Sequence, residues 1–179
     1  MKAFFDIDTQ IDFMFPAGAL YGAGAERLIP VVSRLNHYAA ANGIPLISTM
    51  CAHPEDADEF RVWPPHCVVG TVGQQKPPAT LVANRARQTI VEKNDLDVFS
   101  NPDFIPLLDR LGIEDCYVYG VFLEYCVKCA VLGLLKTGRR VKLVSDATTY
   151  VNADAGRKAL EEFEAAGGSR YQAITASDI

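Results

Sequence analysis

The chain contains no apolar run of about eighteen residues or more, although 49% of its 179 residues are hydrophobic. It therefore offers no segment with the length and composition of a membrane-spanning helix. Its first ten residues, MKAFFDIDTQ, carry carboxylates where a secretory signal needs an unbroken apolar stretch. We therefore expect a cytoplasmic protein with no membrane partner.

Blocks of like charge are also absent from the sequence. The 17 basic and 22 acidic residues give a formal net charge of −5 and are spread along the chain. A nucleic acid or an anionic membrane would need a basic patch or stripe, so we expect neither as a partner. A small neutral or cationic substrate is more compatible with this charge distribution.

Cysteines are few and odd in number, five in all. Without a signal peptide, an odd count argues against a disulfide scaffold and for reduced thiols with separate roles. The length suits one domain with its own core, and we expect residues 1–179 to form a single domain.

Apolar runs of strand length alternate with stretches of helical periodicity. Strands are predicted at residues 2–8, 45–50, 88–92, 116–121, 140–146 and, weakly, 172–175. Helices are predicted at residues 26–41, 102–111, 127–135 and 152–167, with Pro102 in the first turn of the second. Several strands are continuous apolar runs, which is typical of a parallel sheet covered on both faces. We therefore predict a three-layer, doubly wound α/β fold whose mostly parallel sheet has about six strands.

Four polar residues follow the ends of predicted strands: Asp8, Cys51, Lys93 and Cys126. In doubly wound sheets, ligands bind outside the carboxyl ends of the strands, so these side chains are expected to share one rim. There, a carboxylate can accept a thiol proton and an ammonium can keep the carboxylate ionised. At the strand-to-helix junction, the helix dipole is expected to favour a thiolate at Cys126. A structural Asp–Lys pair beside an inert packing thiol is the alternative.

Five segments carry a resemblance to a known family: DTQIDF at 8–13, HPED at 53–56, WPPHCVVGT at 63–71, VEKND at 91–95 and GVFLEYCV at 120–127. With these motifs in this order, the chain resembles the isochorismatase-like cysteine hydrolases, and among them the nicotinamidases, or pyrazinamidases. The resemblance implies hydrolysis of a small amide, such as nicotinamide or a related heteroaromatic amide, through a thioester. It implies a catalytic triad of Cys126, Asp8 and Lys93. It also implies an oxyanion hole from the backbone N–H groups of Phe122 and Cys126, with a cis peptide between Val121 and Phe122.

The same resemblance implies a divalent metal ion, commonly zinc. His53 and His66 match two ligand positions of the family, and Glu59 matches an additional ligand position in the intervening loop. Cys51 stands where the family has an aspartate. Thiolate and imidazole both suit zinc, so Cys51, His53 and His66 are expected as ligands, with Glu59 as a fourth. A loop that has lost its ion is the alternative.

Phe13 and Trp63 match the aromatic walls that the family places around a flat substrate ring, although single aromatics of this kind also serve as core residues. Phe122 replaces a small residue of the nicotinamidases, and its ring is expected to narrow or redirect the pocket. Family resemblance also suggests a homo-oligomer.

Other interpretations of the same residues remain open. Asp6 and Asp12 are rivals of Asp8, and a buried Asp6 would need a partner of its own. Cys126 and Cys129 form a CxxC sequence, which a dithiol redox protein would also have. Within the superfamily, the alternatives are isochorismatase-type ether cleavage and hydrolysis of a carbamoyl or ureido substrate. A binding module without catalysis is a further alternative.

Overall fold

The computed structural model describes residues 1–173 and places six strands in one parallel sheet. The strands are β1 (Lys2–Ile7), β2 (Leu46–Cys51), β3 (Gln88–Lys93), β4 (Asp115–Gly120), β5 (Arg140–Thr148) and β6 (Ser169–Tyr171). Their order is β3-β2-β1-β4-β5-β6. The chain therefore adds β2 and β3 on one side of β1 and then crosses back to add β4, β5 and β6 on the other side. The direction of winding changes between β1 and β4, where a ligand site is expected.

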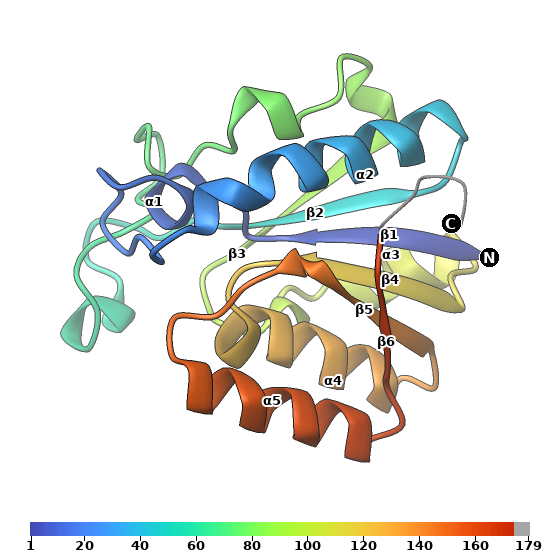
Figure 1. Ribbon diagram of the computed structural model, residues 1–179. Helices are drawn as coiled ribbons and strands as arrows, with labels where there is room; N and C mark the ends of the chain where they lie inside the picture. Colours follow the sequence, from blue (N-terminus) through green and yellow to red (C-terminus); the bar gives the residue numbers. More distant parts are fainter. Residues whose placement is uncertain (174–179) are drawn as a thin grey trace.

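Helices cover both faces of this sheet (Figure 1). The helix α2 (Ile29–Ala41) lies on one face, and α4 (Lys128–Lys136) and α5 (Ala153–Ala165) lie on the other with the shorter α3 (Phe104–Arg110). The single turn α1 (Ile11–Met14) follows β1 at the carboxyl end of the sheet. The predicted three-layer α/β fold is confirmed. Among residues 1–173, we find no helix whose length and hydropathy would suit a bilayer crossing.

Two apolar layers hold the helices to the sheet. Neighbouring side chains of a strand point to opposite faces, so Phe4 joins the layer under α2 and Phe5 joins the layer under the other helices. The first layer contains Val32, Leu35, Ala39 and Leu46, and the second contains Phe104, Leu108, Val131, Leu134 and Phe163. Continuous apolar runs in the central strands are explained by burial on both sides.

Some predicted boundaries are wrong. Pro102 lies before α3, which begins at Phe104, because Asn101 folds the preceding residues into a turn by accepting a hydrogen bond from the Asp103 N–H. The last strand is at Ser169–Tyr171, and residues 172 and 173 are not in a strand. The remainder of the predicted strand, residues 174 and 175, lies outside the described residues. The predicted start of the last helix is confirmed, since the Asn152 side chain caps α5 by accepting from the Ala155 N–H.

A buried polar network surrounds Asp6, as the sequence required. The Asp6 carboxylate lies 3.2 Å from Lys76 Nζ and accepts a hydrogen bond from Thr9 Oγ1 at 2.7 Å. It also accepts from Asn36 and Ser48, and Lys76 donates to Thr9 at 3.0 Å. Lys76 belongs to the long segment between β2 and β3, so this ion pair fastens that segment to β1 beside Asp8.

Replacing Lys76 with methionine is expected to lower the free energy of unfolding by about 3–5 kcal/mol, because the buried Asp6 carboxylate loses its counter-ion. Urea denaturation followed by circular dichroism measures the change. Lys158→Met, at an exposed position of α5, is the matched control and should alter stability by less than about 0.5 kcal/mol. Equal stability of the Lys76→Met variant and the unsubstituted chain would contradict the proposed role of the pair.

Candidate active site

Asp8 is the first residue after β1 and is buried. Its backbone has a positive φ of 47°, a conformation that Asp tolerates better than most residues. Thr49 of β2 donates its hydroxyl to Asp8 Oδ1 at 2.6 Å and accepts the Asp8 N–H at its carbonyl at 3.2 Å. The end of β2 therefore fixes the direction of the carboxylate.

Lys93 is the last residue of β3, and its ammonium connects the polar groups of the rim. Lys93 Nζ lies 2.9 Å from Asp8 Oδ2, 3.1 Å from Cys51 Sγ and 3.6 Å from Cys126 Sγ. It also donates to the Asp95 carbonyl at 2.8 Å. Cys51 and Lys93 are register partners in the β2–β3 ladder, which places their side chains next to each other.

Cys126 lies in an irregular turn between β4 and α4. The predicted cis peptide between Val121 and Phe122 is confirmed. A π-turn at Leu123–Val127 follows, with Tyr125 at φ −119° and ψ −112°, and α4 begins only at Lys128. Gly120, at φ 121°, is needed before this turn because a side chain there would collide with the backbone of Ile7.

The four strand-end residues predicted from the sequence therefore meet in space, and the sulfurs of Cys51 and Cys126 lie within 4.8 Å of an Asp8 oxygen and of each other. The other polar candidates lie elsewhere. Asp6 is in its own network, and Asp12 accepts hydrogen bonds from the N–H groups of Cys67 and Ala19. Asp12 thus has a structural role in the loop.

The carboxylate and the ammonium stabilise each other's charge. Burial alone would raise the pKa of Asp8, but Lys93 and the Thr49 hydroxyl bring that pKa below its ordinary value. Burial alone would lower the pKa of Lys93, but Asp8 and the two sulfurs raise it well above its ordinary value. Both groups are therefore charged at neutral pH.

The two thiols have opposite pKa shifts. A hydrogen bond from Cys126 lowers the pKa of Cys51 to about 6 despite burial, and Lys93 acts in the same direction. The same hydrogen bond, together with burial, raises the pKa of Cys126. Cys51 therefore competes with Cys126 for the negative charge, and α4 begins only two residues after Cys126, so the thiolate expected at Cys126 stays a prediction.

His53, Glu59 and His66 form a second cluster, with one ligand atom of each within 4.8 Å of the others. The two carboxylate oxygens of Glu59 each lie 3.7 Å from one ring nitrogen, Nε2 of His53 and Nε2 of His66. The other ring nitrogens are held by Asn94 Oδ1 at 2.7 Å and by the Pro64 carbonyl at 2.9 Å. Cys51 is grouped with Asp8 and Cys126, but it also interacts with His53 and so lies between the two clusters.

A divalent metal ion fits this second cluster. Within the described part of the chain, His53 Nε2 is buried and has no hydrogen-bond partner. Two imidazoles and a carboxylate are a suitable ligand set for zinc, and the outer ring nitrogens are already fixed as zinc ligands usually are. Burial lowers the pKa of His66, which keeps its ring neutral and able to coordinate.

A cavity of about 350 Å³ joins the two clusters. Cys51 and Cys126 line one part of it, and Glu59 and His66 line another. Its remaining walls are largely aromatic and apolar, and include Phe13, Trp63, Leu96, Phe122, Tyr125 and Val151. The Phe122 ring lies edge-on to Phe13 at 5.9 Å between centroids, and Trp63 lies edge-on to Tyr125 at 5.5 Å. Both aromatic residues singled out in the sequence therefore border the cavity.

Several residues of the site were missed in the sequence. Thr49 could have been found by strand alternation, since it lies two residues before Cys51 in β2 and so points to the same side. The Gln10 side chain holds the backbone of Cys51 with two hydrogen bonds: it donates to the Cys51 carbonyl at 2.8 Å and accepts from the Cys51 N–H at 2.7 Å. The sequence alone gives no sign that Asn94, Tyr125 and Val151 belong to the site.

Comparison with known proteins connects this geometry to a family. Residues 2–173 match the family model described as "Isochorismatase domain". The nicotinamidase/pyrazinamidase of Mycobacterium tuberculosis is 28% identical over 182 residues, covering 93% of this chain and 96% of that protein. The crystal structure of a pyrazinamidase of Pyrococcus horikoshii in complex with zinc superposes with a TM-score of 0.88 at 30% identity, covering 96% of this chain and 98% of that one. A protein of L. infantum in complex with nicotinate gives a TM-score of 0.84 at 26% identity, covering 96% and 92%.

The rate at which iodoacetamide alkylates Cys51 or Cys126 is expected to depend on the negative charge that the two sulfurs share. Because the pKa of Cys51 is lowered to about 6, the thiolate is present above that pH, and the rate of iodoacetamide labelling at Cys51 or Cys126 should rise with a midpoint near 6. Lys93→Met should move this midpoint upward, whereas Lys128→Met on α4 should leave it in place. Peptide mapping across a pH series measures it. A midpoint at about 8.5 in the unsubstituted chain, the value of an ordinary thiol, would contradict the account.

Proposed function

Because this chain belongs to the isochorismatase domain family, we propose that it hydrolyses a small amide to an acid and ammonia through a thioester on Cys126. Nicotinamide or a related heteroaromatic amide is the first candidate substrate, since relatives along nearly the whole chain are nicotinamidases. The observation that carries the proposal is the contact of Lys93 with both Asp8 and the Cys126 sulfur at the wall of an apolar cavity.

In the first half of the reaction, the Cys126 sulfur attacks the amide carbonyl carbon. The thiol proton passes to Asp8, which lies beside both sulfurs and is held ionised by Lys93. When the carbon–nitrogen bond breaks, Asp8 returns this proton to the nitrogen and ammonia leaves. The acyl group is then bound to Cys126 as a thioester.

In the second half, water attacks the thioester carbonyl and gives its proton to Asp8 as the carbon–sulfur bond breaks. Asp8 then returns the proton to the Cys126 sulfur, which restores the starting state. In both halves, negative charge develops on the carbonyl oxygen. The backbone N–H groups of Phe122 and Cys126, at the two ends of the irregular turn, are the proposed donors to that oxygen.

His53, Glu59 and His66 are proposed to hold a divalent ion such as zinc, the ion named for the Pyrococcus horikoshii relative. When bound, such an ion offers an open coordination position to a Lewis-basic atom of the substrate. Cys51 is the remaining candidate ligand, since it lies beside Asp8 and Cys126 and also interacts with His53. Glu59 and His66 border the same cavity as Cys126, so a substrate could contact both clusters at once.

Phe13 and Trp63 are proposed to contact the flat ring of the substrate. Phe122 narrows the space beside Cys126, because its ring packs against Phe13 on one side and close to Gly22 on the other. A slot bounded by rings accepts a planar heteroaromatic amide more readily than a branched acyl group.

Removing the nucleophile or the proton acceptor is expected to lower ammonia release from nicotinamide on the order of 10³-fold or more, because these groups act as a unit. Cys126→Ala and Asp8→Asn test the two roles, with a coupled ammonia assay over a panel of small amides. Cys129→Ala, one helical turn away on α4, is the matched control and should retain turnover. Full activity of Asp8→Asn would remove Asp8 from the mechanism, and full activity of Cys126→Ala would disprove the thioester.

The metal proposal is tested on protein prepared without chelator. Elemental analysis is expected to find about one equivalent of a divalent transition metal, because two imidazoles and a carboxylate form one site. His53→Ala should reduce the content to less than about a tenth of an equivalent, whereas His37→Ala, on the distant helix α2, should keep it. Metal-free native protein, or equal metal content in the two variants, would contradict the site.

A further inference from the structure

Two cysteines face each other at the wall of the cavity, although they come from different strands. Cys51 ends β2 and Cys126 follows β4, and these strands flank β1 on opposite sides. Their sulfurs lie within 4.8 Å of each other, and Lys93 Nζ contacts both of them. Both residues border the cavity, so a molecule that enters it can reach either sulfur.

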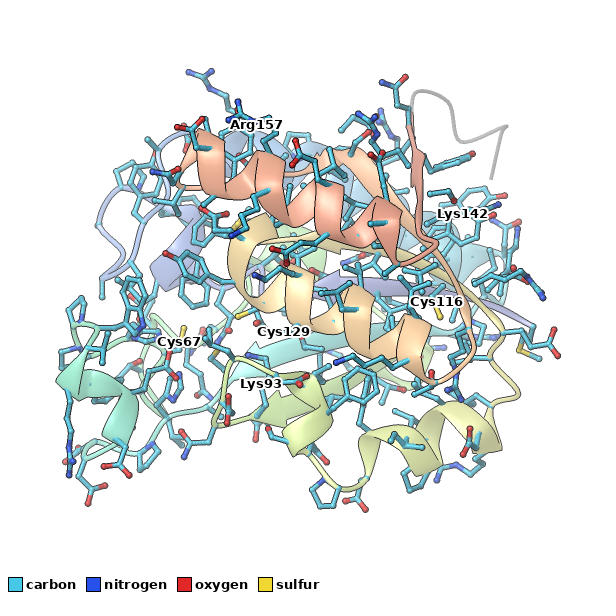
Figure 2. The ribbon with its side chains drawn as sticks, turned by 90° about the horizontal axis from the view of Figure 1, so that it is seen from below. Cys67, Lys93, Cys116, Cys129, Lys142 and Arg157 are labelled. Carbon is cyan, nitrogen blue, oxygen red and sulfur yellow. The ribbon has the colours of Figure 1, made fainter. Side chains whose placement is uncertain are left out.

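The other three cysteines are distributed differently. Cys67 lies in the segment between β2 and β3, Cys116 near the start of β4 and Cys129 on α4. Figure 2 shows Cys67 toward one end of the molecule, Lys93 and Cys129 near its middle, and Cys116 toward the other end. Cys129 is the partner that the CxxC sequence suggests, but the group of neighbouring ligand atoms around Cys126 contains Cys51 and Asp8. Position in space therefore selects Cys51 as the thiol partner of Cys126.

We propose that Cys51 and Cys126 are a reversible oxidation site, and that hydrogen peroxide or another small hydroperoxide converts them to a disulfide. The cavity of about 350 Å³ gives such an oxidant access. Lys93 Nζ contacts both sulfurs and can donate to the peroxide oxygen that leaves as hydroxide.

The chemistry proceeds in two balanced steps. One sulfur attacks a peroxide oxygen, so a sulfur–oxygen bond forms, the oxygen–oxygen bond breaks and hydroxide leaves, taking up a proton to become water. The second thiol then attacks the sulfenic sulfur, so the sulfur–sulfur bond forms and the sulfenic oxygen leaves as a second water with the remaining proton. The two cysteines lose two electrons and two protons in total, and the peroxide is reduced to water.

The geometry requires a limited movement. A sulfur–sulfur bond is about 2.05 Å long, so the two sulfurs must approach by less than about 3 Å from their separation of 4.8 Å or less. Cys51 belongs to a strand of the sheet, whereas Cys126 lies in the π-turn before α4. We therefore place most of the movement in the turn that carries Cys126.

The consequence for catalysis rests on the proposed function. A disulfide would withdraw the nucleophile from reaction, and a dithiol reductant would restore it. It would also stop oxidation before the sulfinic acid, which thiols do not reduce. An oxidised enzyme would therefore be inactive but recoverable.

Intact-protein mass spectrometry tests the proposal without any assay of turnover. After brief exposure to a few equivalents of hydrogen peroxide and quenching with N-ethylmaleimide in denaturant, which exposes the buried thiols, three of the five cysteines should be alkylated in place of all five. Fragmentation should place the crosslink between Cys51 and Cys126. Dithiothreitol should restore labelling of all five. If oxidation has lowered amide hydrolysis, the same treatment should raise the hydrolysis rate of the oxidised protein by at least about tenfold.

Two variants separate the possible partners. Cys129→Ala should still form the crosslink, whereas Cys51→Ala should instead accumulate sulfinic acid at Cys126 that dithiothreitol does not reverse. A crosslink of Cys126 to Cys129, or oxygen addition at Cys126 without any crosslink in the unsubstituted chain, would overturn the proposal. Because the readout is mass, its failure would leave the amide-hydrolysis proposal intact, and an inactive protein could still show the crosslink.

Discussion

The Lys93 ammonium holds the polar rim of the sheet together. It is buried at the end of β3 and contacts the Asp8 carboxylate and two cysteine sulfurs, all of which are also buried. An isolated charge at such a position would be costly, so each group in the cluster depends on the others. The ammonium keeps the carboxylate ionised, and the carboxylate keeps the ammonium protonated. This mutual dependence gives the rim a proton acceptor and a stabilised negative charge beside an apolar cavity.

The topology of the sheet supplies the parts of this cluster from separate segments of the chain. The rim receives Asp8 after β1, Cys51 from β2, Lys93 from β3 and Cys126 after β4, because parallel strands end at one edge. The long segment between β2 and β3 then adds the second cluster, and the buried Lys76–Asp6 pair ties that segment to β1. The cavity is bordered by both clusters, so the fold places the proposed nucleophile and the candidate metal site around one cavity.

Strand ends were predictable from the sequence because apolar runs and the residues that stop them are local features. That is why the α/β fold and the meeting of Asp8, Lys93 and Cys126 could be predicted. Two features were not accessible. The π-turn delays α4 by two residues beyond Cys126, which the apolar periodicity does not show. The place of Cys51 is set by its register partner Lys93, so it faces Asp8 and Cys126 as well as His53, whereas the resemblance had grouped it with the histidines alone.

Two adjacent thiols make the identity of the nucleophile the central question. Lys93 contacts both sulfurs, whereas the proposed oxyanion donors lie in the turn that carries Cys126. Acid-quenched protein taken during turnover of a slow amide substrate, digested and sequenced by mass spectrometry, distinguishes them directly. We predict the acyl mass on Cys126 alone, and the same mass on Cys51 would contradict the proposed mechanism.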